Sequence, residues 1–247
     1  MRHDAQIVDR AAALNAGVDG HDAAGAIRHV LGDDTIGPVA LVSSFGADSA
    51  VLLHLVAGID PDLPVIFVDT GKHFAETIDH QRALTRRLGL RDVRRQMPAE
   101  GRVARADPDG TLHETDPDGC CALRKTAPLN AALKGFDGWI SGRKRHQSDT
   151  RTALEMFEVE NFRLKINPLA HWGADDLSAY AAEHDLPPHP LVAHGYGSIG
   201  CAPCTGPVAE DEDPRAGRWR GKAKTECGIH VASGYSAPCP RSRMSRR

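Results

Sequence analysis

The chain has 247 residues, of which 41% are hydrophobic and 26% are charged, and its formal net charge is −3. This composition and length are those of a globular protein with one well-buried domain, so wholesale disorder is excluded. The slight negative charge argues against nonspecific nucleic-acid binding, and no apolar run approaches the roughly 20 residues of a membrane-spanning helix. The opening residues MRHDAQIVDR lack the apolar stretch of a secretory signal. We therefore expect a cytoplasmic protein that enters no membrane.

The first half of the chain alternates between short apolar runs and longer amphipathic segments. Residues 1–37 predict a helical lead-in, with Asp22 placed to cap the helix AAGAIRHVL. From Pro38, the run PVALVS predicts a strand, FGADS a turn and SAVLLHLVAGI a buried helix. The pattern returns at Pro64 with PVIFVD and a following helix, and RDVRRQM at Arg91 predicts a third strand. This alternation predicts an α/β fold with a twisted, parallel-type sheet and helices on both faces.

The second half continues the sheet and then loses regular structure. A loop rich in Asp, Pro and Gly, residues 99–119, precedes the predicted helix CCALRKTAPLNAALKG, and GWISGRKRHQSDTR predicts a strand and a basic loop. GADDLSAYAAEHDL from Gly173 predicts one more helix, and we expect loops from Leu186 onward. The division is thus a lead-in over 1–37, one domain over 38–230 and an Arg- and Ser-rich tail over 231–247 that we expect to be disordered.

Two loops follow predicted strands and suit an anionic ligand. In the first, small residues join a strand to a helix, so backbone N–H groups and the helix N-terminus face whatever occupies the loop. The loop has no lysine and no GxxxxGK[ST] motif, which disfavours ordinary NTP hydrolysis. A second loop at the end of the next strand shares the same sheet edge, where ligands of parallel sheets collect. Taken alone, the sequence of either loop is explained equally well by a tight connection with a capping Asp and a turn Gly. The candidate ligand-binding residues are Ser43, Ser44, Phe45, Gly46, Asp48 and Ser49 in the first loop and Asp69, Thr70 and Gly71 in the second.

Four cysteines form two pairs, Cys120 with Cys121 and Cys201 with Cys204. In a reducing compartment such pairs favour metal ligation over disulfides, and four thiolates complete a tetrahedral zinc site or a four-iron cluster. Adjacent cysteines are unusual for structural zinc, whose ligand pairs are normally two to four residues apart. Spacing therefore favours an iron-sulfur cluster, while zinc and scattered buried thiols stay open as alternatives.

Cys227 stands apart from these pairs, in the segment KTECGIH. A glycine follows the thiol, and Lys224 and His230 lie three residues to either side. A positive neighbourhood raises the thiolate fraction, so Cys227 is a candidate nucleophile, with a passive cysteine near a chain end as the alternative. Cys239 is more simply a spare thiol.

Taken together, SSFGADS, VDTGKHF, CCALRK, SGRKRHQSDTR, GYGSIGCAPCT and KTECGIH resemble the successive motifs of the assimilatory sulfonucleotide (APS/PAPS) reductases. The resemblance spans residues 38–230 and implies the adenine-nucleotide alpha hydrolase-like fold. Because all four paired cysteines are present, the chain is similar to the adenylyl-sulfate (APS) branch, and the resemblance implies a [4Fe-4S] cluster on Cys120, Cys121, Cys201 and Cys204.

For this chain, the resemblance implies reduction of adenylyl sulfate to sulfite and AMP in sulfate assimilation and cysteine biosynthesis. Cys227 would attack the sulfate sulfur and become an S-sulfocysteine, and thioredoxin or a similar dithiol would then release sulfite. The resemblance also implies catalytic roles for Lys125 and His230, and anion contacts from Arg143, Arg145, Arg215 and Arg218.

Three alternatives to this assignment remain at the level of sequence. The first is a phosphoadenylyl-sulfate (PAPS) or dual-substrate reductase. The second is a nucleotide-activating tRNA-thiolating ligase, against which stand the missing loop lysine and the modest charge. The third is a nucleotide-binding iron-sulfur sensor without catalysis. A homo-oligomer is compatible with the sequence.

Overall fold

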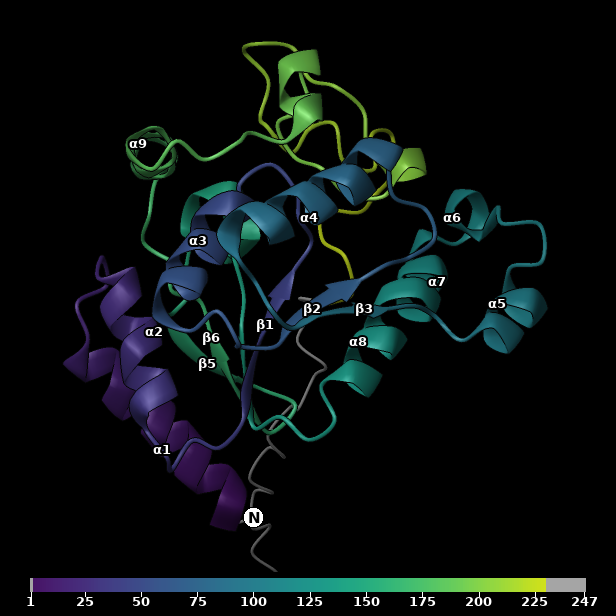
Figure 1. The fold of residues 1–247 in the computed structure, drawn as a ribbon. Coiled ribbons are helices and arrows are strands. Elements are labelled where there is room, and N and C mark those ends of the chain that lie inside the picture. The colour runs from purple at the N-terminus through teal and green to yellow at the C-terminus, as the bar shows by residue number, and fades with distance from the viewer. Residues whose placement is uncertain (1, 230–247) are drawn as a thin grey trace, which may run out of the picture.

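The computed structural model describes residues 2–229, apart from the side chains of residues 2–5 and 149 (Figure 1). The expected disordered tail over 231–247, with Cys239, and the candidate residue His230 lie outside the described residues. The proposed division of the chain at residues 37 and 230 stays a prediction.

A six-stranded sheet with the order β3-β2-β1-β4-β6-β5 forms the centre of the molecule. All neighbouring strands are parallel except the edge pair β5 and β6, which is antiparallel. The registers Leu41 to Val65 and Leu41 to Ile140 align β1 with its two neighbours. The α/β fold with a mainly parallel sheet is therefore confirmed. The strands are β1 Val39–Ser43, β2 Val65–Val68, β3 Val93–Gln96, β4 Gly138–Ile140, β5 Phe157–Glu160 and β6 Arg163–Ile166.

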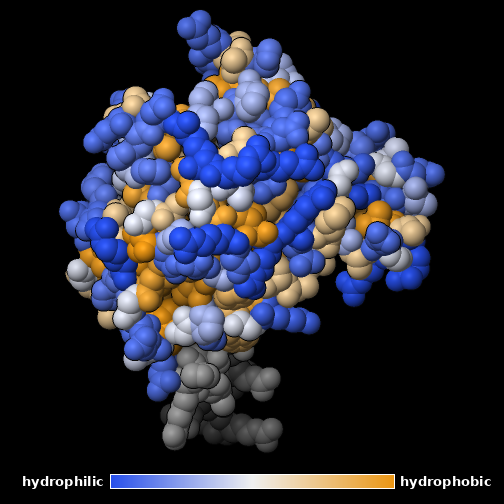
Figure 2. Space-filling view, viewed as in Figure 1, coloured by the Kyte–Doolittle hydropathy of each residue, from blue (hydrophilic) through white to orange (hydrophobic). Residues whose placement is uncertain are grey.

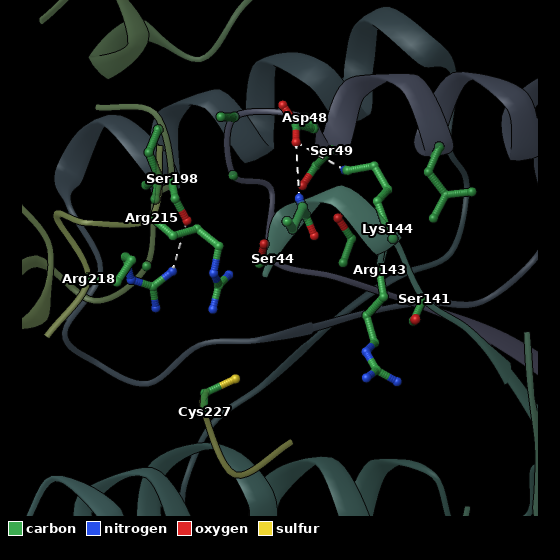
Figure 3. Close-up of a pocket in the computed structure, with 18 of the residues that line it drawn as sticks. Ser44, Asp48, Ser49, Ser141, Arg143, Lys144, Ser198, Arg215, Arg218 and Cys227 are labelled. Atoms are coloured by element: carbon green, nitrogen blue, oxygen red, sulfur yellow. Dashed lines mark hydrogen bonds and ion pairs between the residues drawn. The ribbon is translucent and has the colours of Figure 1, made fainter. Parts of the chain in front are cut away.

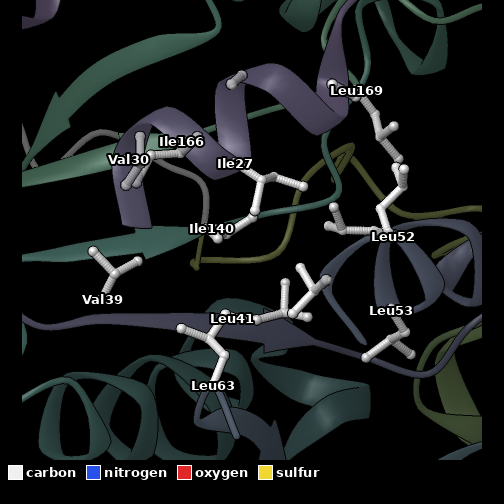
Figure 4. Close-up of a cluster of buried hydrophobic side chains, with 14 of the residues drawn as sticks. Ile27, Val30, Val39, Leu41, Leu52, Leu53, Leu63, Ile140, Ile166 and Leu169 are labelled. Carbon is white, nitrogen blue, oxygen red and sulfur yellow. The ribbon is translucent and has the colours of Figure 1, made fainter. Parts of the chain in front are cut away.

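Helices cover both faces of the sheet because the buried strands carry apolar side chains on both sides. Leu41 packs into the larger cluster with Ile27 of α2 and Leu53 of α3, whereas its neighbour Ala40 faces Leu129 of α8 (Figure 4). In Figure 1, α3 and α4 accordingly lie on one side of the strands and α7 and α8 on the other. The helices are α1 Arg2–Gly17, α2 Ala23–Gly32, α3 Ser49–Ile59, α4 Ala75–Leu88, α5 Glu100–Ala106, α6 Leu112–Thr115, α7 Pro117–Cys121, α8 Ala127–Ala132 and α9 Ala174–Glu183.

The first helix, α1, packs against the outer strands β5 and β6. Asp22 caps α2 by accepting a hydrogen bond from Gly25 N at 2.7 Å. Asn15 of α1 both donates to Phe157 O, at 2.8 Å, and accepts from Phe157 N, at 3.0 Å. The amide of Asn15 thus satisfies backbone groups of the edge strand β5 that would otherwise be open to another chain.

The hairpin of β5 and β6 is not evident from the sequence. Asn161 and Phe162 at its turn both have positive φ, of 50° and 61°. A two-residue turn of this kind normally has the sequence Asn-Gly. Because Phe162 takes the place of the glycine, the usual turn motif is absent from the sequence.

The expected loop over 99–119 instead contains α5, α6 and the start of α7. Asp107, between α5 and α6, accepts from Leu112 N at 2.8 Å and pairs with the buried Arg124 at 2.7 Å. Arg124 also donates to Thr70 O at 3.0 Å, which ties this insertion to the loop after β2.

Polar side chains cover most of the face in Figure 2, and the exposed apolar side chains form small patches between them. None of the described helices is both long enough and apolar enough to cross a bilayer.

Candidate active site

A cavity of about 410 Å³ opens where β1 and β4 end, the size of a small-ligand site. Ser43 ends β1 and Ser141 follows β4, so the carboxyl edge of the sheet forms the floor, as expected for a parallel sheet. Five residues of the first candidate loop line the cavity: Ser43, Ser44, Gly46, Asp48 and Ser49. The loop therefore borders a ligand-sized space and is more than a connection.

Two features of the first loop fix its shape. Phe45 has φ of 50° and is fully buried, packing edge-to-face on Phe67 at 5.4 Å between ring centroids. It anchors the loop from beneath and does not line the cavity. A Cβ on Gly46 would lie 3.2 Å from the carbonyl oxygen of Ile199, so glycine permits the close approach of the 197–200 segment. These two contacts therefore fix the shape of the loop that leads into α3.

Cationic side chains enter the cavity from two sides, with Arg143 and Lys144 following β4 and Arg215 and Arg218 coming from the C-terminal region (Figure 3). The first pair is neutralised: Lys144 Nζ lies 3.0 Å from Asp48, and Arg143 lies 3.0 Å from Glu158. Burial lowers the pKa of Lys144, against the opposing effect of Asp48.

By contrast, Lys125 and Arg218 have no carboxylate partner among the described residues. Arg218 stacks over the ring of Trp219 at 4.5 Å and donates to Ser198 at 3.3 Å. Burial lowers the pKa of Lys125, but the electrostatic influence of the neighbouring Cys201 and Cys227 outweighs burial and raises the pKa. Lys125, which is only 9% exposed, therefore keeps its positive charge.

The second candidate loop does not line the cavity, and its side chains contact other parts of the protein. Asp69 accepts from Gly71 N at 2.8 Å and from Arg95 Nε at 2.6 Å, and Gly71 has φ of 70°. Thr70 Oγ1 lies 3.3 Å from Cys201 Sγ. Asp69, Thr70 and Gly71 thus connect the carboxyl edge of the sheet to Cys201 and do not line the cavity.

The four paired cysteines lie close enough for their charges to influence one another. Cys120 and Cys121 end α7 and are buried, and a π-helical turn, residues Ala122–Thr126, follows them and carries Lys125. Burial, reinforced by Cys121, raises the pKa of Cys120 to about 11, and burial also raises the pKa of Cys121 and Cys204. Thiols in such a setting become thiolates only when a metal displaces their protons.

The four paired cysteines supply the thiol donors that both candidate metals take. A single zinc holds four sulfurs at about 2.3 Å from one centre, whereas a four-iron cluster takes one thiolate at each iron corner. Among the described residues, no group of three or more His, Cys, Asp or Glu side chains is arranged to hold a metal ion. The donor set fits a cluster by its chemistry, and the choice of metal stays a prediction.

Cys227 is half-buried and its thiol points into the cavity from below (Figure 3). The preceding Glu226 is held by Arg151, with Nε to Oε1 and Nη2 to Oε2 both at 2.7 Å. Burial opposes the charged form of Glu226, but the hydrogen bonds from Arg151 outweigh burial and lower the pKa of this carboxyl. Lys125, Arg215 and Arg218 line the same cavity as Cys227.

The basic loop differs in detail from the prediction. Arg143 lines the cavity, but Arg145 does not; its guanidinium donates to Leu154 O at 2.6 Å. Lys144 and Arg151 line the cavity instead, together with further polar residues that the sequence reasoning did not select, among them Ser141, Gln147, Ser198 and Glu226. Glu226 and Arg151 lie within the two quoted motifs KTECGIH and SGRKRHQSDTR, and their opposite charges were the available signal.

Comparison with known proteins identifies a reductase family. The model of the phosphoadenosine phosphosulfate reductase domain matches residues 38–207. The adenosine 5'-phosphosulfate reductase of Mesorhizobium japonicum is 54% identical over 194 residues, covering 78% of this chain and 76% of that protein. The phosphoadenosine 5'-phosphosulfate reductase of Gloeobacter violaceus is 42% identical over 202 residues, covering 78% and 82%.

Solved structures agree with the fold. The phosphoadenylyl-sulfate reductase from Candida auris, in a phosphate complex, superposes with a TM-score of 0.64 at 26% identity, covering 81% of this chain and 97% of that one. The FMN adenylyltransferase of Candida glabrata has a TM-score of 0.53 at 15% identity, covering 86% and 79%, and shares the fold alone. The expected adenine-nucleotide hydrolase-like architecture is thereby confirmed.

Proposed function

The chain belongs to the phosphoadenosine phosphosulfate reductase family and is an oxidoreductase that reduces adenylyl sulfate in sulfate assimilation, and we propose that Cys227 is its nucleophile. The observation that carries this proposal is the position of the Cys227 thiol, in one cavity with the α3 loop and with Lys125 and Arg218. A thiolate and an anionic phosphosulfate repel each other, and cations without carboxylate partners are what such an encounter requires.

In the first step, the Cys227 thiolate attacks the sulfur of adenylyl sulfate. The new S–S bond forms as the bond between that sulfur and the phosphate oxygen breaks, and AMP leaves with the electron pair. The N-terminus of α3 and the loop Ser43 to Ser49 would hold the nucleotide phosphate. Lys125, Arg215 and Arg218 would stabilise the charge on the sulfate oxygens, and His230 would assist at the phosphate.

In the second step, thioredoxin or a similar dithiol removes the sulfonate from Cys227. One thiolate of the dithiol attacks the Cys227 sulfur and sulfite leaves with its bonding electrons. The second thiolate then resolves the mixed disulfide and restores the Cys227 thiol, so the dithiol is oxidised. Such a reductant suits the cytoplasm, as do cysteines that serve as metal ligands and nucleophile in place of disulfides.

Cys120, Cys121, Cys201 and Cys204 would hold a [4Fe-4S] cluster. When bound, that cluster supplies a fixed charge beside Lys125 and an anchor for the two chain segments that carry the cysteines. Thr70 would donate its hydroxyl to Cys201, and Lys125 would stay oriented towards the cavity between the cysteine sulfurs and Cys227.

The 3'-phosphorylated nucleotide is the second candidate substrate, beside adenylyl sulfate. The four paired cysteines support adenylyl sulfate, and the match to the Gloeobacter violaceus relative, named for the 3'-phosphorylated substrate, favours testing the second. Adenylyl sulfate should give the higher kcat/KM.

The test is an anaerobic assay of the wild type and Cys227→Ser with each nucleotide and thioredoxin, with iron and sulfide measured on the same samples. Wild type should release sulfite and AMP together, and the variant should release neither while keeping its iron. Sulfite release at the wild-type rate by Cys227→Ser would exclude Cys227 as the nucleophile.

A further inference from the structure

Glu226, the residue before Cys227, makes an unusual number of contacts for a side chain on a loop. Besides the two-pronged pair with Arg151, it lies 3.4 Å from Arg215 Nη2 and accepts from Ser148 at 3.3 Å. The side chains of Glu226 and Arg151 are only 12% and 5% exposed. A pair so shielded from water is costly to break, because either partner alone leaves an uncompensated buried charge.

Arg151 directs its two-pronged edge at the residue next to the thiol. Its Nε and Nη2 are engaged by Glu226, and its Nη1 donates to Gln147 Oε1 at 2.6 Å. Three of the five guanidinium N–H groups are thereby used, and the Nε–Nη2 edge that would bind an anion with two hydrogen bonds already holds a carboxylate. The contact with the Cys227 segment therefore accounts for the position of Arg151 in the cavity wall.

The contacts continue from Arg151 to the nucleotide loop. Gln147 Nε2 donates to Asp48 Oδ2 at 3.3 Å, and Lys144 pairs with the same carboxylate oxygen. Asp48 is the residue at the N-terminus of α3. On the other side, Arg215 donates to Thr225 O at 2.8 Å and so holds the backbone of the same segment. Charged and polar groups thus connect the α3 loop to the residue next to the thiol.

We propose that the ion pair between Glu226 and Arg151 is a latch that holds the Cys227 thiol in the cavity. Glu226 is a positioning residue for the reaction assigned above, and in that respect the inference rests on the proposed function. The pair fixes the thiol where the nucleotide loop, Lys125 and Arg218 converge. Opening the pair frees the segment and presents the Cys227 sulfur to solvent, where a dithiol reductant can reach it.

The experiment measures how fast iodoacetamide, an uncharged reagent, labels Cys227 in the iron-loaded full-length protein without nucleotide. Labelling is read at Cys227 by peptide mass spectrometry. Glu226→Gln and Arg151→Gln should each label at least about tenfold faster than wild type, the population change expected from losing a charge-assisted buried contact. The double variant should label no faster than the faster single variant, since both changes open one latch.

The two single variants distinguish opening of the Glu226–Arg151 ion pair from a change in the charge of the Cys227 thiol. Removing Glu226's negative charge favours the Cys227 thiolate, whereas removing Arg151's positive charge disfavours it. An effect through charge alone would therefore speed labelling in Glu226→Gln and slow it in Arg151→Gln. That pair of results, or labelling unchanged in both, would overturn the latch.

The matched control is Glu212→Gln, which breaks the more exposed ion pair with Arg220 and should label at the wild-type rate. Iron content of each variant identifies any loss of the folded cysteine site. Single-turnover reaction with adenylyl sulfate is followed on the same samples. Fast labelling together with slow sulfonation supports the latch, whereas a wild-type protein that labels normally but never becomes sulfonated would overturn the proposed function and leave the latch standing.

Discussion

Lys125 offers the sharpest test of how the cavity meets its substrate. Its ammonium group is almost fully buried beside Cys201 and Cys227, and no carboxylate neutralises it among the described residues. We predict that Lys125→Gln, which keeps the polarity and most of the length but removes the charge, will slow sulfonation of Cys227 and leave AMP binding nearly unchanged. AMP lacks the sulfate group that approaches the thiol.

The size of the effect follows from burial. Two unit charges 4 Å apart interact by about 4 kcal/mol at an effective dielectric constant of about 20. Part of that is recovered by the neutral amide and by the remaining arginines, and loss of one preorganised donor typically costs about 100- to 1,000-fold in rate. We therefore expect kcat/KM to fall by about 100- to 1,000-fold in Lys125→Gln.

The assay is single-turnover sulfonation of Cys227, quenched in acid and quantified by mass spectrometry. Lys134→Gln, the same substitution at an exposed lysine just beyond α8, should react like wild type. Lys125→Arg, which keeps the charge, should recover part of the rate. Iron analysis confirms that each variant retains its metal. Sulfonation by iron-loaded Lys125→Gln within about threefold of wild type would refute the electrostatic role of Lys125.

Two further predictions concern stability. Burial lowers the pKa of His189 to about 4, so the imidazole binds a proton more readily in the unfolded chain than in the folded protein. The free energy of unfolding should therefore fall by up to about 3 kcal/mol as the pH drops from about 6.5 to 4. His189→Asn should flatten that dependence in urea titrations, and an unchanged slope would contradict the assignment. Asp107→Asn leaves Arg124 buried without its counter-charge and should lower the free energy of unfolding by about 3 to 5 kcal/mol, whereas an unchanged urea midpoint would count against it.

Much of the fold is predictable because its strands are short apolar runs flanked by amphipathic helices. The parallel strands at Val39 and Val65 follow that pattern, and the helices after them are regular. The β5–β6 hairpin was missed because its turn depends on Phe162 at positive φ. The helices of the 99–119 insertion were missed because Asp107 and Arg124, far apart in sequence, stabilise them through a tertiary contact.

The reactive residues of the site were likewise easier to predict from the sequence than the contacts between their side chains. Cysteine spacing and the segment around Cys227 single out reactive residues directly. Which basic residue faces the cavity depends on the path of the loop after β4, whose short turns place Lys144 and Arg151 inward and Arg145 outward. The partnership of Glu226 with Arg151 spans 75 residues and could not be read from either motif alone.

The most direct measurement is the chemical state of Cys227 after anaerobic incubation of the iron-loaded protein with adenylyl sulfate and no reductant. One sulfonate group on Cys227 per AMP released, removed as sulfite when reduced thioredoxin is added, is the predicted result. AMP and sulfite formation with Cys227 unmodified throughout would contradict the account.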